Sequence, residues 1–175
     1  NNIAKVIEGM NFPSFIGLCE VENETVLKDL VAQKQFGERK YGIAHQESPD
    51  FRGIDVALIY NEKDFKVQET KTIVINFPAA IVENYTTRDI LMVKGTYKKK
   101  HELYLFVNHW PSRRGGLAQS EPKRTYVATQ LKRAADSLFA IHADANIVIM
   151  GDFNDETDNK SVREVLEAEN RTATI

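Results

Sequence analysis

The stretch "NIVIMGDFND", residues 146–155, runs the apolar residues from Ile147 to Met150 directly into a glycine, two carboxylates and an amide. A short continuous apolar run predicts a buried strand, and Gly151 allows a sharp turn where that strand ends. If the segment stays extended, Asp152 and Asn154 share one face, while Phe153 points into the core. Asp and Asn are also ordinary turn residues, so this stretch alone fits a simple turn as well as a reaction site.

An EF-hand calcium loop that begins at Asp152 is excluded by its own spacing rules. Thr157 stands at the sixth position, where the loop needs Gly, and Arg163 stands at the twelfth, where it needs Glu. A strand rather than a helix is also predicted before it. The carboxylate and amide therefore need another explanation.

Two further apolar segments end in side chains that are common in catalysis. "FIGLCEVEN" reaches Glu20, and "LYLFVNHW" reaches Asn108 and His109. A single Glu after a strand is usually solvated, and a single His there is more often structural than catalytic. Strand ends at one edge of a sheet converge on one crevice, so three such ends together predict a site.

The remaining pattern predicts helices outside packed sheets, an α+β arrangement. Ile3, Val6, Ile7 and Met10 recur at helical spacing and predict one buried helix face. The expected strands are residues 13–23, 40–46, 53–61, 65–77, 88–97, 101–110 and 146–151. The other expected helices are residues 24–37, 120–142 and 160–168.

The composition is typical of an ordinary globular protein. We expect one domain over residues 1–175 and a monomer. The net charge of -2 gives no global basic field of the kind found in proteins that coat duplex DNA. No apolar run approaches the ~20 residues that span a bilayer. Cys19 is the only cysteine, so neither an internal disulfide nor a cysteine zinc site can form. The sequence does not distinguish a secreted or periplasmic protein from a cytoplasmic one.

Five segments in order resemble the endonuclease/exonuclease/phosphatase family, the superfamily of DNase I. They are "GLCEVEN" around Glu20, "RGIDVALIY" at 52–60, "TTRDILMVKG" at 86–95, "NHWPSRRGG" at 108–116 and "VIMGDFND" at 148–155. The resemblance implies a four-layer α/β/β/α sandwich of two mostly antiparallel sheets. Family members also carry an Asn on a first strand and an Asp-His pair on a late strand. This sequence shows neither, so we expect the fold to be incomplete at both termini.

The resemblance also assigns roles at matching positions. Glu20 matches a divalent-metal ligand, and His109 matches the position that supports the scissile phosphate or the leaving group. Asp152 matches the carboxylate that positions or deprotonates the attacking water, and Asn154 matches an amide that contacts the phosphoryl oxygens. Arg88 matches a basic position close to the site.

Further substrate contacts are expected from the residues around these positions. Arg113 and Arg114 lie in the Gly-rich loop after His109, where a solvated loop is the alternative reading. Asn108 precedes His109 at the strand end, and Arg52 precedes the strand that begins near Asp55. Arginine suits these positions because its guanidinium can bind phosphate with two hydrogen bonds.

The predicted function is a divalent-metal-dependent phosphoesterase that hydrolyses a phosphodiester. Mg²⁺ is the expected cofactor because it prefers oxygen ligands and often uses only one or two carboxylates; Mn²⁺ and Ca²⁺ are the alternatives. Among the candidate activities we favour a nuclease-like one, with nucleic acid among the candidate substrates. A phosphoinositide phosphatase or a sphingomyelinase of the same family is the alternative, as is a non-catalytic binding module that has kept the fold.

Overall fold

The computed structural model describes residues 2–168 of the chain. The helical elements within this range are α1 (Asn2–Gly9), α2 (Glu24–Val31), the 3-10 turn η1 (Lys34–Phe36), α3 (Leu117–Ile141) and the π-helical turn η2 (Ser161–Val165). The strands are β1 (Phe15–Val21), β2 (Tyr41–His45), β3 (Asp55–Asn61), β4 (Phe65–Ile73), β5 (Ile90–Tyr97), β6 (His101–His109) and β7 (Asn146–Asp152).

The strands form two sheets. The first has the order β1-β3-β2 and is antiparallel. The second has the order β4-β5-β6-β7 and is antiparallel except between β6 and β7, which run parallel. A parallel pair needs a long crossover, and α3 supplies it. The carboxyl ends of β6 and β7 consequently lie at the same end of the second sheet.

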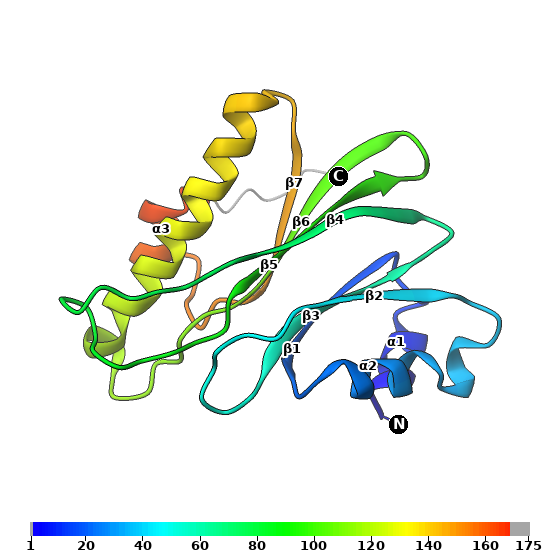
Figure 1. The fold of residues 1–175 in the computed structure, drawn as a ribbon, viewed down its shortest axis with the longest axis horizontal. Coiled ribbons are helices and arrows are strands. Elements are labelled where there is room, and N and C mark those ends of the chain that lie inside the picture. The colour runs from blue at the N-terminus through cyan, green and yellow to red at the C-terminus, as the bar shows by residue number, and fades with distance from the viewer. Residues whose placement is uncertain (1, 169–175) are drawn as a thin grey trace.

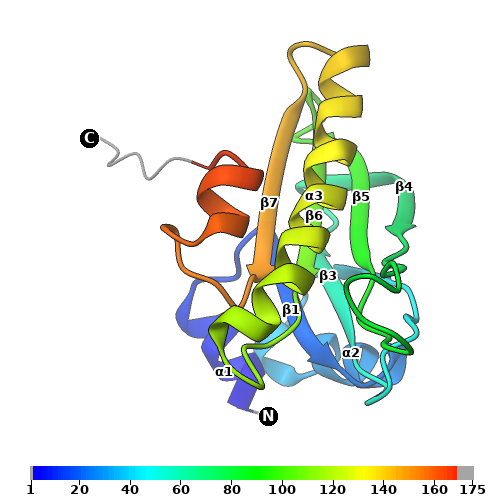
Figure 2. The ribbon, with the colours of Figure 1, turned by 90° about the vertical axis from the view of Figure 1, so that its left-hand side faces the viewer.

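The two sheets and the helices form a layered sandwich (Figure 1). Side chains along each central strand point alternately into the core between the sheets and into the core beneath the helices. Leu58 of β3 and Leu105 of β6 belong to the core between the sheets. The neighbouring Ile59 packs in the core beneath α1 and α2, and Phe106 packs in the core beneath α3. Since successive side chains point to opposite faces, each central strand is buried on both sides. The predicted four-layer α/β/β/α sandwich of mostly antiparallel sheets is confirmed, and Figure 2 shows α3 lying across the outer face of the second sheet.

Two helical predictions were wrong in detail. On α1 the buried residues are Ala4 and Ile7, whereas Val6 on the helix and Met10 just after it are 60% and 50% exposed, so only part of the expected apolar face meets the sheet. The expected last helix is shortened to the single wide turn of η2, in which Leu166 N donates to Ser161 O. Within residues 2–168, no helix combines the length and apolar character required to cross a membrane.

Candidate active site

Glu20 reaches solvent because β1 bulges at its carboxyl end. The pairing of β1 with β3 shifts between Cys19 and Val21, and Glu20 at the shift has a φ of 59°. A bulge re-aims the side chain that it carries, and the Glu20 side chain is 64% exposed. Its Oε1 lies 3.6 Å from Nη1 of Arg52. The strained backbone therefore presents a carboxylate beside a guanidinium at this end of the first sheet.

His109 and Asp152 are aligned across the second sheet. They are register partners at the carboxyl ends of the parallel strands β6 and β7. His109 Nε2 lies 3.8 Å from Asp152 Oδ2, too far for a direct hydrogen bond. The imidazole is 5% exposed and the carboxylate 55% exposed, so Asp152 faces solvent beside a nearly enclosed ring.

Gly151 has a different role from the one predicted. It lies inside β7 with a φ of 133° and does not form the turn after the strand. A Cβ at this position would collide with the backbone of Asn108, its register partner on β6. Glycine is required here because the two parallel strands approach closely next to the site.

Asp152 and Asn154 come together through a turn, and the extended geometry that we predicted for them was wrong. Asn154 has a φ of 51°, and its backbone N–H donates to Asp152 Oδ1 at 2.9 Å. Its side-chain amide donates to the carbonyl oxygen of Trp110 at 3.0 Å. Phe153 packs edge-on against Trp110 as expected for a core residue, with ring centroids 4.8 Å apart. One oxygen of Asp152 is thus fixed by the turn, while the other lies toward His109.

Asp50 organises the basic part of the site, and no sequence pattern indicated this role. Its Oδ2 accepts from Arg88 Nη1 at 3.0 Å, and its Oδ1 accepts from the backbone N–H of Arg52 at 3.0 Å. Both members of the Asp50–Arg88 ion pair are buried. Arg88 Nη2 also donates to Trp110 O at 2.7 Å, so one carbonyl binds both Arg88 and Asn154. Asp50 lies in an irregular loop, where no periodicity could have singled it out.

The charges around His109 come from both sheets. Burial lowers the pKa of its imidazole below the ordinary value, and the Arg88 guanidinium lowers it further. The carboxylates of Asp152 and Glu20 oppose that shift in pKa. His109 is therefore neutral at neutral pH. Among residues 2–168 its buried Nδ1 has no hydrogen-bond partner; an orphaned N–H costs more than an orphaned lone pair, which favours the tautomer with its proton on Nε2, toward Asp152.

Asn108 does not reach the site surface, so the prediction that it binds substrate was wrong. Its side chain is fully buried; Nδ2 donates to Met150 O at 3.3 Å, and Oδ1 accepts from Trp110 Nε1 at 3.2 Å. Trp110 is equally buried, which excludes a role in stacking on a base. Asn108 also accepts the Cys19 thiol on its backbone carbonyl at 3.4 Å, a contact that links β1 to β6.

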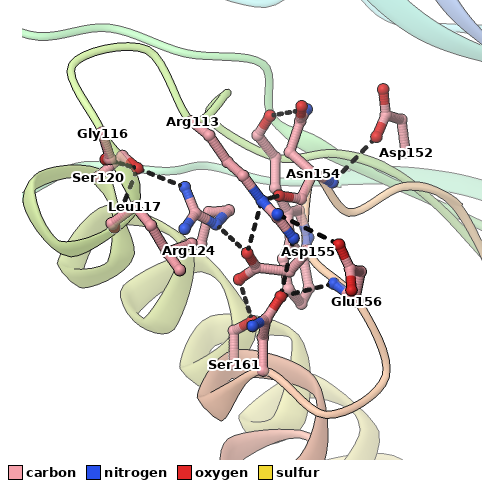
Figure 3. A network of polar contacts seen from close by, with 12 residues as sticks. Arg113, Gly116, Leu117, Ser120, Arg124, Asp152, Asn154, Asp155, Glu156 and Ser161 are labelled. Carbon is pink, nitrogen blue, oxygen red and sulfur yellow. Dashed lines mark hydrogen bonds and ion pairs between the residues drawn. The ribbon is translucent and has the colours of Figure 1, made fainter.

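Arg113, expected to bind substrate, is hydrogen-bonded within the protein, while its side chain remains 37% exposed and lines a hollow with Asp152 and Asn154. Its Nε donates to Asn154 O at 2.8 Å (Figure 3). Its Nη2 donates to Asn159 Oδ1 at 2.8 Å. The Asp155 side chain, which is 1% exposed, completes the cluster: Arg124 Nε lies 2.7 Å from its Oδ1, and Ser161 Oγ donates to its Oδ2 at 2.5 Å. This network fixes the loop that follows β7 and thereby supports Asp152 and Asn154.

The profile described as "Endonuclease/Exonuclease/phosphatase family" matches residues 1–174. The chain belongs to the endonuclease/exonuclease/phosphatase family. No curated protein gives a significant match.

Solved structures with this fold agree with the family assignment. The human Nocturnin catalytic domain with bound sulfate is 17% identical, with a TM-score of 0.69, 92% of this chain covered and 58% of that chain. D. rerio TDP2 complexed with a single-strand DNA product is 16% identical, with a TM-score of 0.65 and coverages of 94% and 56%. ANGEL2, a 2',3'-cyclic phosphatase, is 17% identical, with a TM-score of 0.68 and coverages of 95% and 46%. The chain therefore spans about half the length of the proteins that it resembles.

Glu20 fits the sparse divalent-metal site that this family implies. Its carboxylate is exposed, and within residues 2–168 its one ion pair is the 3.6 Å contact with Arg52. Mg²⁺ commonly uses one or two carboxylates and keeps several waters. In the described part of the chain, the one group of three possible ligand residues is elsewhere: His45, Glu47 and Asp55, whose atoms lie within 4.8 Å of one another. Asp55 there is already committed, since Oδ2 lies 3.0 Å from His45 Nε2 and Oδ1 accepts two hydrogen bonds from Ser48. We therefore infer that this cluster stabilises the loop that contains Asp50.

Two hollows of the described structure lie away from Glu20, His109 and Asp152. They have volumes of about 660 and 670 Å³ and surround Glu62 and Lys63, beyond the opposite end of β3 from Asp55. Neither contains Glu20, His109 or Asp152, so their size carries no argument about the chemistry.

Proposed function

We propose that the chain is the core of a divalent-metal-dependent phosphoesterase that hydrolyses a phosphodiester by in-line attack of water. The observation that carries the proposal is the arrangement around His109. Its Nε2 lies 3.8 Å from Asp152 Oδ2, and Cys19, the neighbour of Glu20 on β1, donates to the carbonyl oxygen of Asn108, the neighbour of His109 on β6. Family membership supports the same class of reaction.

Asp152 is proposed to orient and deprotonate the attacking water. Its Oδ1 is fixed by the backbone N–H of Asn154, and the carboxylate is more than half exposed. Water oxygen forms the new bond to phosphorus, its proton passes to Asp152, and the bond from phosphorus to the leaving oxygen breaks. The leaving oxygen takes its proton from solvent.

His109 is proposed to donate a hydrogen bond to a phosphoryl oxygen. Burial and Arg88 lower the pKa of the imidazole, so the ring is neutral and can offer its Nε2–H without adding a positive charge. Asn154 can add its second amide N–H, because Trp110 O binds only one. Both donors are held by packed neighbours before substrate binds, which is the condition for efficient electrostatic stabilisation.

Glu20 is proposed to hold Mg²⁺, with Mn²⁺ or Ca²⁺ as alternatives. When bound, the ion supplies positive charge for the phosphoryl and leaving oxygens. Arg52, 3.6 Å from Glu20, adds a second positive charge at the same place. Arg88 contributes mainly through its field, because Asp50 and Trp110 O already bind its terminal nitrogens.

A nucleotide phosphodiester is the favoured substrate class. D. rerio TDP2 was captured with a single-strand DNA product, and ANGEL2 was captured with adenosine-2',3'-vanadate. A phosphoinositide phosphatase, a sphingomyelinase and a non-catalytic module are the competing assignments. A panel of DNA, RNA, phosphoinositides and sphingomyelin on the full-length protein separates them.

The first test is hydrolysis of bis(4-nitrophenyl) phosphate by the full-length protein with Mg²⁺ or Mn²⁺. Turnover should stop with EDTA. Glu20→Gln should lower kcat/KM by about 100-fold or more, because the change removes the carboxylate that holds the ion. Turnover is measured as release of 4-nitrophenolate.

Glu62→Gln is the matched control for this test. It removes the same charge from an exposed position at the opposite end of the first sheet, and its activity should equal that of the wild type. Turnover that survives EDTA, or full activity in Glu20→Gln, would contradict a metal site at Glu20. No turnover of any substrate in the panel would favour the binding module.

A further inference from the structure

A basic cavity of about 240 Å³ adjoins the proposed catalytic residues. Its charged lining consists of Arg52, Arg88, Arg114 and Lys123, and no carboxylate is among its lining residues. Two of these four side chains also belong to the catalytic region: Arg52 lies 3.6 Å from Glu20, and Arg88 binds Trp110 O next to His109. The cavity therefore shares two of its arginines with the region where the scissile phosphate is expected.

The positive charge in this cavity is only partly compensated. Asp50 pairs with Arg88 and lies 3.5 Å from Arg52 Nε. Arg114 and Lys123 take part in no ion pair within residues 2–168, unlike Arg113, which is bonded along its whole guanidinium. Lys123 Nζ rests 4.6 Å from the ring centroid of Tyr85, which leaves its charge available at the cavity. Two cations without acidic partners, facing a shared hollow, indicate an anionic ligand.

An exposed aromatic ring stands at the rim of the same cavity. Phe51 is 70% exposed and lines the cavity beside Arg52, whose guanidinium lies 5.9 Å from the ring centroid. A single exposed hydrophobic residue is common on protein surfaces. A ring next to a basic hollow, however, has the geometry by which proteins stack a base while they bind the adjoining phosphate.

The volume limits what the cavity can enclose. Pockets that enclose drug-sized ligands measure about 300–1,000 Å³, so a hollow of about 240 Å³ suits a small anionic group better than a whole nucleotide. The base would then remain outside, against Phe51.

We propose that this cavity binds a second phosphate group of the substrate, next to the scissile one, while Phe51 stacks on the intervening base. The inference rests on the proposed function and narrows it to a nucleotide substrate with at least two phosphates, as in a single strand of nucleic acid. Arg114 and Lys123 are the specificity-determining residues. A phosphoinositide also carries further phosphates, but it offers no base to Phe51.

The test compares substrates that release the same chromophore. The first pair is thymidine 5'-(4-nitrophenyl phosphate), which has one phosphate, and its 3'-phosphorylated form, which has two. The second pair is thymidine 3'-(4-nitrophenyl phosphate) and its 5'-phosphorylated form, which test the opposite strand polarity. In at least one polarity the full-length protein with Mg²⁺ should show a kcat/KM about tenfold or more higher for the substrate with two phosphates, as expected for charged hydrogen bonds to the added group. The double variant Arg114→Gln/Lys123→Gln should reduce that ratio to about one while still hydrolysing the substrate with one phosphate.

The paired control removes two charges elsewhere. Lys99→Gln/Lys100→Gln alters the exposed hairpin turn between β5 and β6 and should keep the wild-type ratio. Phe51→Ala should lower kcat/KM for both thymidine esters by a larger factor than for methyl 4-nitrophenyl phosphate, which has no base. A wild-type ratio of one in both polarities, or a ratio that survives in Arg114→Gln/Lys123→Gln, would overturn the cavity assignment.

Binding measured without turnover separates the two proposals. In calorimetry, thymidine 3',5'-bisphosphate should bind more tightly than either monophosphate, and the double variant should lose that difference. If no ester is hydrolysed but this difference is present, the proposed reaction fails and the phosphate site stands. If inositol 1,4-bisphosphate binds equally well and Phe51→Ala changes nothing, the base-stacking part of the proposal is wrong.

Discussion

Gly151 shows how one residue sets the spacing of two strands beside the site. Its φ of 133° is a region that side chains rarely adopt, and a Cβ would meet the Asn108 carbonyl. Backbone atoms cannot rotate away as a side chain can, so neither β6 nor β7 can absorb the contact without moving. The positions of His109 and Asp152, one residue further along each strand, depend on this approach.

Gly151→Ala should lower the free energy of unfolding by about 2–4 kcal/mol, since it adds a steric clash to a strained φ. Gly116→Ala is the control, because Gly116 has a φ of 103° and a Cβ added there would have no neighbouring atom within 4 Å; it should cost only about 1 kcal/mol of strain. Urea unfolding measures both. Equal losses in the two variants would mean that the close approach to Asn108 contributes nothing.

At the scale of elements, the loop after β7 is held by buried charge. Asp155 and Arg124 are 1% and 0% exposed, and Arg113 joins them from the loop before α3 (Figure 3). Buried pairs are not necessarily stabilising relative to apolar residues, but removing one partner leaves a charge without compensation. The loop therefore depends on contacts between residues from 31 (Arg124 and Asp155) to 46 (Arg113 and Asn159) positions apart in the chain.

Asp155→Ala should lower the free energy of unfolding by about 3–5 kcal/mol, because Arg124 would remain buried without its partner. Asp158→Ala, in the same loop but exposed, should change it by no more than about 0.5 kcal/mol. Denaturant unfolding of both variants measures the difference. If Asp155→Ala proved as stable as Asp158→Ala, the network would have no role in holding the loop.

At the scale of the whole molecule, the proposed site takes Glu20 from one sheet and His109 and Asp152 from the other, so its geometry depends on how the sheets pack. Gly17 of β1 faces Met150 of β7, and a Cβ on Gly17 would lie 2.9 Å from Met150 Sδ and 3.3 Å from Val107 Cγ1. Glu20 is three residues beyond this contact, and Asp152 is two residues beyond Met150. A change in sheet spacing here would move the proposed metal ligand relative to the proposed base.

Gly17→Val should separate β1 from β7 and lower kcat for bis(4-nitrophenyl) phosphate by about tenfold or more, since misplacement by about 1 Å can cost 100-fold. Gly17→Ala is the graded control. Flexible Met150 can move away from one methyl group, so its activity should stay within about twofold of the wild type. Wild-type kcat in Gly17→Val would show that sheet spacing does not control the site.

Local sequence determined the elements and most of the candidate residues. The apolar runs before Glu20, His109 and Asp152 predicted β1, β6 and β7, because strand formation needs only a local pattern and burial. The order of motifs predicted the family and its layers. The three strand ends belong to two sheets and not to one edge as expected: His109 and Asp152 are register partners, and the Cys19 thiol next to Glu20 contacts Asn108 next to His109.

Only the tertiary structure decided which polar groups remain available. Arg113 and Arg114 are equivalent in the sequence, yet Arg113 is bonded to the loop after β7, whereas Arg114 lines the basic cavity. Asp50 pairs with Arg88 across 38 residues, and Asn108 turns its amide into the core. Local patterns specify which backbone a segment adopts, but a hydrogen-bond partner is set by which distant segment packs against it.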